Sequence, residues 1–232
     1  MIKDEPTSTT PRSDPSRKEK LLAASLDIFG RYGFDGTSTR QLADAAGVNL
    51  QAIPYYFGGK DGLYIATADH LVSLIEAHVG EMRRQMGARL AALDAAGESL
   101  ASTEARLLLT GIARTMITLF VSKQSEAWAR FIIREQMEPT EAFERIYQGI
   151  MAPMIGIVRR LVAAILEADP ASEPVRLRAL SFVGGILVFR VAHAAILAQM
   201  EWETVGPRQL EALHDLAADL VAALEPTKGP AA

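Results

Sequence analysis

The sequence predicts an all-α protein, on three observations. Apolar residues recur every three or four positions through most of the 232 residues. No segment shows the alternation of apolar and polar residues that is typical of strands. Glycine, proline and small polar residues separate the periodic segments at short intervals. Since 49% of the residues are hydrophobic, we expect helices packed around a sizeable core.

Composition divides the chain into four segments. Residues 1–15 are polar and contain three prolines, so we expect a disordered arm that is neither a signal peptide nor a membrane anchor. Residues 16–62 are expected to form a three-helix domain and residues 63–226 a larger helical domain. Residues 227–232 are expected to be a disordered tail.

Charge and cysteine content restrict the function. The net charge is −4, but residues 1–60 carry eight Lys or Arg against seven Asp or Glu, which leaves the excess of acid on the remainder. A DNA-binding surface would therefore be a local patch on an acidic body, and its affinity should fall as salt rises. The chain has no cysteine, which excludes disulfides and thiolate chemistry and fits the cytoplasm, where we expect the protein.

The first helix is predicted over residues 17–32. Ser16 or Asp14 can cap its start, and Gly33 can end it. Three basic residues lie in its first turn and can either contact DNA phosphates or form a solvated end; both alternatives stay open. They are Arg17, Lys18 and Lys20.

Two short helices joined by a tight turn are predicted next. Thr37 or Ser38 can cap the first helix, and Gly47 can enter the left-handed region that such a turn requires. Asn49 can cap the second helix. This arrangement is a helix-turn-helix unit, whose second helix enters the DNA major groove. Pro54 falls inside that second helix, which we therefore expect to be short or bent.

Side chains in and around this unit can contact a DNA duplex in two ways. Amide and phenol groups can form hydrogen bonds with base edges, and the candidates are Asn49, Gln51 and Tyr55. Hydroxyl and basic groups near helix ends can contact phosphates, and the candidates are Thr37, Thr39, Arg40, Tyr56 and Lys60.

The same region resembles the TetR family of bacterial transcriptional regulators. The pattern consists of Phe29, Gly33, Thr37, Leu42-Ala43, Ala46-Gly47-Val48, Tyr55-x-Phe57 and Lys60-x-x-Leu63. The segment 107–202 is similar to the CecR-like subgroup of that family. The resemblance implies that movement of the helix after Lys60 couples an occupied pocket to the separation of two DNA-reading heads.

A long helix is predicted from Lys60 to about Ala91. Gly80 and Gly87 each weaken it by about 1 kcal/mol relative to alanine, so we expect a bend or an end near them. The residues 91–102 are small and polar and are expected to form a loop or a frayed turn, which is also a candidate boundary.

The remaining helices of the larger domain follow from apolar periodicity. They are predicted over residues 103–122, 125–136, 140–168 and 175–200, with a last helix beginning at Gly206-Pro207. Pro153 lies inside the third of these segments, where we expect a kink because the apolar spacing continues beyond it.

The segment 175–200 is the most apolar part of the chain. Arg190 and His193 lie inside it, so we expect a buried helix and no membrane partner. Its adjacent glycines suit the close approach of another backbone, and the last helix carries a leucine stripe. We expect the two helices to pair with their symmetry mates in a homodimer. The candidate dimerisation residues are Gly184, Gly185, Leu213, Leu216 and Leu220.

No group of residues in the larger domain indicates an enzyme. Acid, base and nucleophile side chains do not converge, and the four histidines lack metal-ligand spacing, so we expect no catalytic residue, metal or cofactor. Apolar and polar residues suited to a small-molecule pocket are Met116, Phe120, Trp128, Arg134, Tyr147, Met151, Arg190 and His193.

Two arginines one turn apart, Arg130 and Arg134, repel each other unless a carboxylate or an anionic ligand lies near. Carboxylates that can balance them are Glu126, Glu135 and Glu138. Arg190 and His193 are expected to share one helix face. One hypothesis is that Arg134 and His193 orient an inducer.

These observations favour a ligand-responsive DNA-binding transcriptional regulator. We expect a repressor that binds a palindromic double-stranded DNA operator as a homodimer and is released by a small-molecule inducer. An activator would share every residue and differ only in promoter geometry. A different class, a helical small-molecule-binding protein or enzyme without DNA binding, would use the first three helices only for packing.

Overall fold

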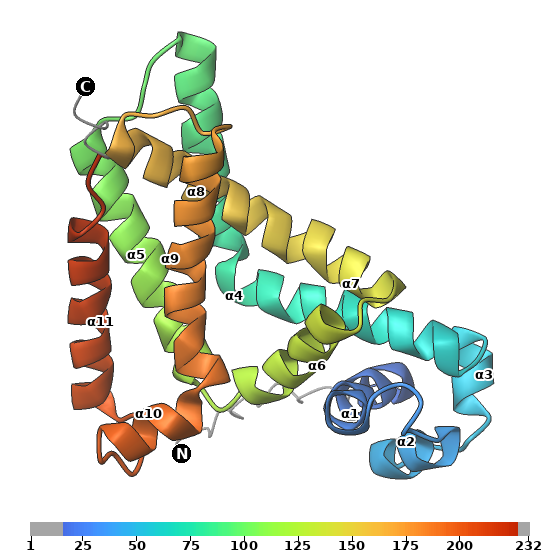
Figure 1. Ribbon diagram of the computed structural model, residues 1–232. Helices are drawn as coiled ribbons and strands as arrows, with labels where there is room; N and C mark the ends of the chain where they lie inside the picture. Colours follow the sequence, from blue (N-terminus) through green and yellow to red (C-terminus); the bar gives the residue numbers. More distant parts are fainter. Residues whose placement is uncertain (1–15, 227–232) are drawn as a thin grey trace, which may run out of the picture.

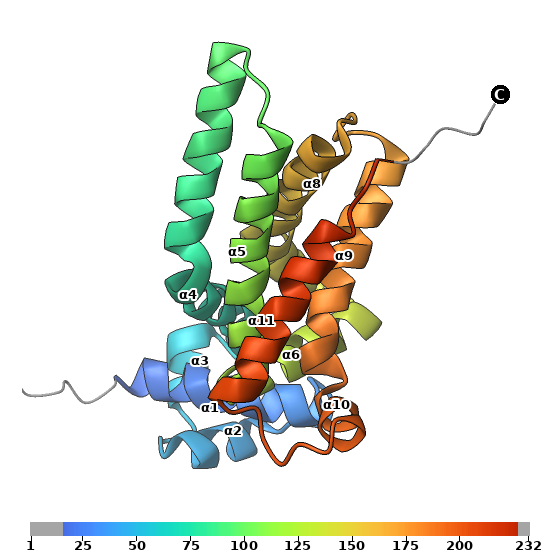
Figure 2. The same cartoon turned by 90° about the vertical axis from the view of Figure 1, so that its left-hand side faces the viewer.

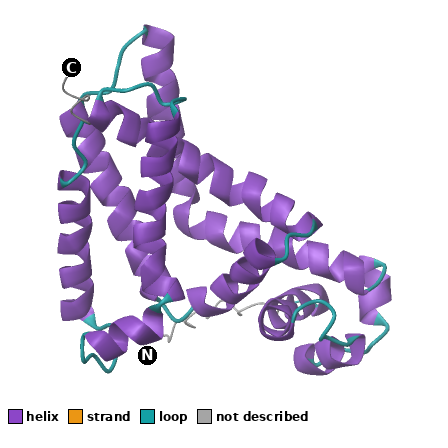
Figure 3. Ribbon diagram, viewed as in Figure 1, coloured by secondary structure: helices purple, strands orange, loops and turns teal. Residues whose placement is uncertain are grey.

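The computed structural model describes residues 16–226, and every regular element in that range is a helix (Figures 1 and 3). The prediction of an all-α protein is confirmed. The elements are α1 (Arg17–Tyr32), α2 (Thr39–Ala46), α3 (Ala52–Phe57), α4 (Lys60–Ala96), α5 (Ser102–Val121), α6 (Ser125–Met137), α7 (Glu141–Ile146), the π-helix η1 (Tyr147–Met151), α8 (Ala152–Leu166), α9 (Glu173–Val191), α10 (His193–Gln199) and α11 (Pro207–Ala222). The predicted arm and tail, residues 1–15 and 227–232, lie outside the described range.

Helices α1 to α3 form a small head at one end of the molecule (Figures 1 and 2). Ser16 begins α1 with a capping box, because its hydroxyl accepts from the Glu19 N–H at 3.2 Å and the Glu19 carboxylate accepts from the Ser16 N–H at 2.7 Å. Leu42 and Ile53 are fully buried and pack the three short helices onto the start of α4. The head is therefore a packed unit from which α4 leads into the body.

The body is a bundle in which α5 packs against α8, α9 and α11. Figure 2 shows α5, α11 and α9 running along one side of the molecule. Helices α6 and α7 lie between this bundle and the head, and α6 packs along α1. The head is thus attached to the body in two places, by the covalent connection through α4 and by the α1–α6 contact.

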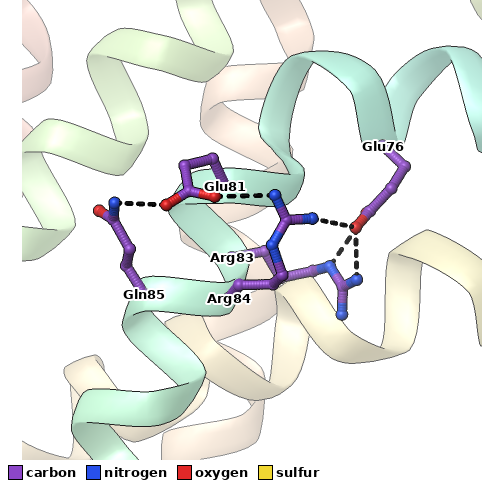
Figure 4. Close-up of polar contacts among 5 residues, drawn as sticks. All are labelled: Glu76, Glu81, Arg83, Arg84 and Gln85. Atoms are coloured by element: carbon purple, nitrogen blue, oxygen red, sulfur yellow. Dashed lines mark hydrogen bonds and ion pairs between the residues drawn. The ribbon is translucent and has the colours of Figure 1, made fainter.

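Helix α4 is longer than predicted, since it ends at Ala96 and not near Ala91. The loop between α4 and α5 is correspondingly shorter than predicted. Figure 1 shows that α4 runs away from the head and then turns along the body, so the expected bend is present. At this part of the helix Glu76 accepts from Arg83 at 2.6 and 3.1 Å, and Arg84 pairs with Glu81 at 2.8 Å (Figure 4).

Instead of the kink expected at Pro153, the structure has a wider, π-helical turn just before it. Residues 147–151 form one π-helical turn directly before the proline, and the Ala152 N–H reaches the Tyr147 carbonyl five residues back. Since proline has no N–H and its ring crowds the preceding turn, one extra residue in that turn lets the helix continue.

The run 141–166 is long and apolar enough to cross a membrane by length and composition alone, but half of its most apolar window is buried inside the protein. Helix α8 packs against both α5 and α9. Burial in the bundle therefore accounts for the apolar character of this run.

The single helix predicted over residues 175–200 is wrong. Helix α9 ends at Val191, Ala192 leaves the helical conformation, and α10 begins at His193 after a bend of 77°. Beyond the bend Ile196 and Trp202 are half-buried against the core. The gain from packing these two side chains onto the bundle decides the path of the chain, and it depends on residues far away in the sequence.

Helix α9 is apolar on two sides. Its inner side chains are buried against the bundle, and they are Val175, Ala179, Phe182, Ile186 and Phe189. Its outer side chains are exposed, and they are Leu177, Leu180, Leu187, Val188 and Val191. Gly184 and Gly185 lie on the exposed side, where a Cβ atom would meet nothing within 4 Å. Within residues 16–226, the outer face of α9 thus has no neighbouring helix packed on it.

Candidate DNA-binding surface

The turn between α2 and α3 is built by local capping. Ser38 begins α2, and its hydroxyl accepts from the Gln41 N–H at 3.1 Å. Gly47 ends α2 with φ +63°, in the left-handed region, and no atom lies within 4 Å of a Cβ placed there. Asn49 then starts the next turn, because its side-chain oxygen accepts from the Gln51 N–H at 2.9 Å. The predicted helix-turn-helix unit therefore has the backbone that its sequence indicates.

Helix α3 is short, as Pro54 led us to expect, and has six residues. Pro54 occupies the third position of the helix, within the first turn, where backbone N–H groups have no partner inside the helix. The proline therefore removes no helical hydrogen bond. Its carbonyl accepts from the Gly58 N–H at 3.0 Å, which closes the end of α3.

The candidate base-reading residues lie on the outer surface of the head. Asn49 and Gln51 are exposed, and the Tyr55 side chain is 79% exposed. Tyr55 lies edge-on to Tyr56, with ring centroids 4.8 Å apart. The Asn49 side chain does not cap α3 as predicted, because Gln51 is the N-cap of this helix and receives no side-chain cap. The Asn49 oxygen accepts instead from the Gln51 N–H, which leaves the Gln51 and Tyr55 side chains more freedom to contact bases.

The basic start of α1 lies beside this surface. Arg17 lines the same shallow depression as Gln51, Tyr55 and Tyr56. Lys18 places its ammonium group 6.0 Å from the centre of the Phe57 ring. Of the two alternatives for this basic turn, the DNA-facing one fits its position, because positive charge adjoins the exposed face of α3.

Four of the five candidate phosphate contacts have side chains at the surface of the head. Thr39 is half-buried and Arg40 is exposed at the start of α2, and Tyr56 is 40% exposed on α3. Lys60 is half-buried at the start of α4, with its ammonium group 4.2 Å from the centre of the Phe34 ring. These four side chains all reach the surface of the head.

Thr37 does not have the exposed hydroxyl that a phosphate contact needs, and this prediction must be corrected. The residue is 2% exposed, and its hydroxyl donates to the Gly33 carbonyl at 2.6 Å. Gly33 itself has φ +74°, so the chain turns sharply between α1 and α2. Thr37 therefore closes this turn.

The residues predicted to line a small-molecule pocket do not converge on one cavity. Trp128 is buried and lies edge-on to His78, whereas Tyr147 stacks on Phe143 at the body surface. Met151 approaches the Gln136 amide, with 3.4 Å between sulfur and nitrogen. Met116 and Phe120 are half-buried on α5.

Arg190 and His193 do not share a helix face, because the break at Ala192 separates them. Arg190 donates to the Ser122 carbonyl at 3.1 Å and so ties α9 to the turn between α5 and α6. Arg134 lies at the other end of α6, about 14 Å along the helix from Ser125. Arg134 and His193 are thus held in different parts of the molecule, against the hypothesis that they orient one ligand together.

Arg130 and Arg134 also differ in their partners. Arg130 forms ion pairs with Glu126 at 2.5 Å and with Asp27 of α1 at 2.8 Å, so the salt-bridge alternative holds for it. Burial by itself would raise the pKa of Asp27, but hydrogen bonds and charges from Arg31 and Arg130 together lower it. The Nε atoms of both arginines are buried without a hydrogen-bond partner, so the ion pairs of Arg130 are what distinguish the two.

A cleft of about 560 Å³ lies where the head meets the body, and sequence analysis did not identify it. Residues that line it include Tyr32, Phe34, Tyr64, Arg134, Glu135 and Thr140. They come from α1, α4, α6 and the segments that follow α1 and α6, so no local pattern brings them together.

Comparisons with known proteins agree with this geometry. A family model described as bacterial regulatory proteins of the tetR family matches residues 21–67. A second model, described as the C-terminal domain of the HTH-type transcriptional dual regulator CecR, matches residues 105–225. The chain is 32% identical over 197 residues to the HTH-type transcriptional dual regulator CecR of Shigella flexneri, covering 85% of this chain and 86% of that protein.

A second relative matches a much shorter part of the chain. The HTH-type transcriptional regulator RutR of Escherichia coli (strain K12) is 37% identical over 68 residues, which cover 29% of this chain and 32% of RutR. Among solved structures, AibR in complex with isovaleryl coenzyme A and operator DNA superposes with a TM-score of 0.61 at 15% identity, covering 88% of this chain and 97% of AibR. FadR from Bacillus subtilis in complex with stearoyl-CoA gives 0.55 at 14% identity, with 88% and 97% covered.

Proposed function

This chain belongs to the TetR family of bacterial transcriptional regulators, in the group that CecR represents, and from that membership we propose that it represses transcription as a homodimer bound to a palindromic operator. A small molecule bound by the body would release it from the DNA. The family makes it a DNA-binding regulator, so the alternative of a helical enzyme or binding protein without a DNA contact is set aside. We place its action in the cytoplasm, where its bacterial DNA target lies.

The observation that carries the proposal is the exposed face of α3. Gln51, at the N-cap of this short helix, and Tyr55, within it, are both exposed. The turn that precedes the helix is formed by Gly47 and by the Asn49 side chain. The basic first turn of α1 lies next to them. A helix of this kind enters a major groove, and flanking basic and hydroxyl groups contact the phosphates.

We propose that the second copy packs on the outer face of α9. The exposed leucines and valines of this face recur at helical spacing around Gly184 and Gly185, where two backbones can approach closely. On α11, Leu216 is 41% exposed and Leu220 is half-buried, so both can extend the same contact. Leu213 is only 5% exposed and contributes to the core of its own chain. In a two-fold dimer the recognition helices would reach major grooves about 34–36 Å apart.

The ligand belongs to the body in this proposal, and an acyl-coenzyme A is the first class to test. Two proteins of the same fold, AibR and FadR, have been solved with such molecules bound. Titration of the protein–operator complex with acyl-coenzyme A of increasing chain length should show release at one range of lengths.

DNA binding is tested with a fragment from the region upstream of the protein's own gene. Wild type should bind it in a salt-dependent way, and Tyr56→Ala and Lys60→Ala should each weaken binding by about tenfold because each removes a phosphate contact. Lys123→Ala is the matched control, since Lys123 is an exposed lysine between α5 and α6 and should bind like wild type. Absence of binding to any DNA at low salt would refute the proposal.

Activation is a second candidate, because the relative that matches most of the chain is named a dual regulator. The two activities need the same DNA contacts and differ in where the operator lies relative to the promoter. Transcription in vitro from the native promoter, with and without the protein, separates them. A fall in transcript supports repression, and a rise supports activation.

A further inference from the structure

The head is held on the body by close contact between α1 and α6. A Cβ atom at Gly30 would lie 3.2 Å from the Arg130 Cβ and 3.3 Å from the Phe131 backbone nitrogen, so the two helices touch almost backbone to backbone. Asp27 of α1 pairs with Arg130 of α6 beside this contact, at 2.8 Å. Together with α4, the position of α6 therefore fixes the position of the head.

One turn beyond this contact, α6 carries a buried carboxylate. Glu135 is 1% exposed and is the one charged residue that is buried in the described part of the chain. It accepts hydrogen bonds from the Tyr64 hydroxyl on α4, and from the Thr140 N–H at 3.1 Å and the Thr140 hydroxyl at 2.8 Å. A carboxylate is retained in such a place only when donors satisfy it, and here they come from α4 and from the start of α7.

Tyr64 links Glu135 of the body to aromatic side chains of the head. Its ring lies 4.8 Å from that of Phe29 in α1 and 5.2 Å from that of Phe34, both edge-on, and 5.1 Å from that of Phe131 in α6. Burial, and then the hydrogen bond and charge of Glu135, raise the pKa of Tyr64, so its hydroxyl stays protonated and donates. The ring packs against the head while the hydroxyl is held by the body.

We propose that Glu135 is a positioning residue that sets the angle of the head on the body, and thereby the distance between the two recognition helices of a dimer. The inference rests on the proposed function. Glu135 joins α4, α6 and α7 at one point, next to the contact that carries α1. A shift of α7 that moves Thr140 would act on Glu135 and, through its hydrogen bond to Tyr64, on the aromatic side chains of the head.

The test measures operator spacing and not affinity alone. Synthetic operators carry the same half-sites with spacers changed by one or two base pairs in either direction. Wild type should prefer one spacing, and Glu135→Gln, which keeps the shape but removes the charge, should lower the ratio of best to worst affinity by roughly tenfold. Glu138→Gln removes an exposed carboxylate at the same end of α6 and should keep the wild-type ratio.

A second measurement does not use DNA. The chain has no cysteine, so Asp44→Cys on the exposed side of α2 accepts a single spin label per subunit. Electron–electron distance measurements on the labelled dimer should give a narrow distribution, which Glu135→Gln broadens. Tyr64→Phe, which removes only the hydroxyl, should broaden it too and replaces Glu135→Gln if that variant does not fold.

Two results would overturn the inference. One is a uniform loss of affinity at every spacing with an unchanged distance distribution, since Glu135 would then only stabilise the fold. The other is wild-type behaviour of both Glu135→Gln and Tyr64→Phe. If wild type itself bound no DNA, the proposed function would fail. The distance distribution would still show whether Glu135 sets the angle of the head on the body.

Discussion

The hydroxyl groups of Thr37, Ser38 and Tyr56 have different structural roles although the residues lie close together in the sequence. The Thr37 hydroxyl is buried against the Gly33 carbonyl, and the neighbouring Ser38 hydroxyl caps α2. Tyr56 keeps its side chain at the surface. Residue type alone does not separate these roles, because each group can donate or accept in the same way. Burial distinguishes Thr37 from the other two, which are both exposed, and the capping contact distinguishes Ser38 from Tyr56.

The buried role of Thr37 predicts an effect on stability. Thr37→Val keeps the shape of the side chain but removes the hydroxyl, so we expect a loss of about 1 kcal/mol in the free energy of unfolding. Operator affinity of the folded protein should not change. Urea denaturation and DNA titration measure the two effects. A weaker affinity with unchanged stability would restore Thr37 as a phosphate contact.

Two glycines are predicted to respond to alanine with opposite signs. Gly47 has φ +63° at the end of α2, so Gly47→Ala should destabilise by about 1–2 kcal/mol through backbone strain. Gly87 lies inside α4 with open space around it, so Gly87→Ala should stabilise by up to about 1 kcal/mol. Since neither site lacks room for a methyl group, backbone conformation is the only difference. Equal effects in thermal unfolding would contradict this account.

At the scale of the elements, the contacts between helices determine how the head is attached to the body. Helix α6 is held at one end by Arg190 of α9 and along its length by α1. Near the bend of α4, Glu76 bridges to Arg83, two helical turns further on (Figure 4). The head is therefore linked to the body by two helices, each held by ionic side chains.

The ion pair between α1 and α6 predicts a dependence on pH. The pKa of Asp27 is lower in the folded protein than its ordinary value of 3.8, so the unfolded chain binds this proton at a higher pH. The pair stabilises the fold above about pH 4, and this contribution is lost as pH falls through the folded pKa. Asp27→Asn should therefore differ most from wild type at neutral pH and least near pH 2.

Denaturation at several pH values measures this difference. Asp44→Asn is the matched control, because Asp44 is an exposed carboxylate of the same head. It should follow wild type across the whole range. A difference between wild type and Asp27→Asn that stays constant with pH would show that the carboxylate charge does not stabilise the α1–α6 contact.

At the scale of the whole molecule, function requires two heads at a set separation. One head makes few contacts, because α3 has only six residues. Two linked heads bind with an affinity far above that of one, since the second contact becomes intramolecular. The outer face of α9 is the surface on which this linkage depends in our proposal.

A charge on that face should separate the dimer. Leu180→Glu places a carboxylate on the outer side of α9, where Leu180 is 50% exposed in the single chain, so we expect a monomer by light scattering and at least about a tenfold loss of operator affinity. Met137→Glu is the control, because Met137 is 77% exposed at the end of α6. It should remain dimeric. A dimeric Leu180→Glu would exclude this face as the interface.

The sequence alone determined the helical class, the helix-turn-helix unit and the family, and it located most helix starts. Each of these depends on residues within one or two turns of each other. Ser16 caps α1 through Glu19, and Gly47 ends α2 by its own conformation. Such interactions are visible in the sequence because the residues that make them are neighbours in it.

Only the tertiary structure decided how the head is joined to the body. Tyr64 and Glu135 are 71 residues apart in the sequence, and Asp27 and Arg130 are 103 apart. The break between α9 and α10 likewise follows from packing onto distant helices. The free energy of such contacts depends on the path of the whole chain, so no local pattern records which carboxylate will be buried or which arginine will be paired.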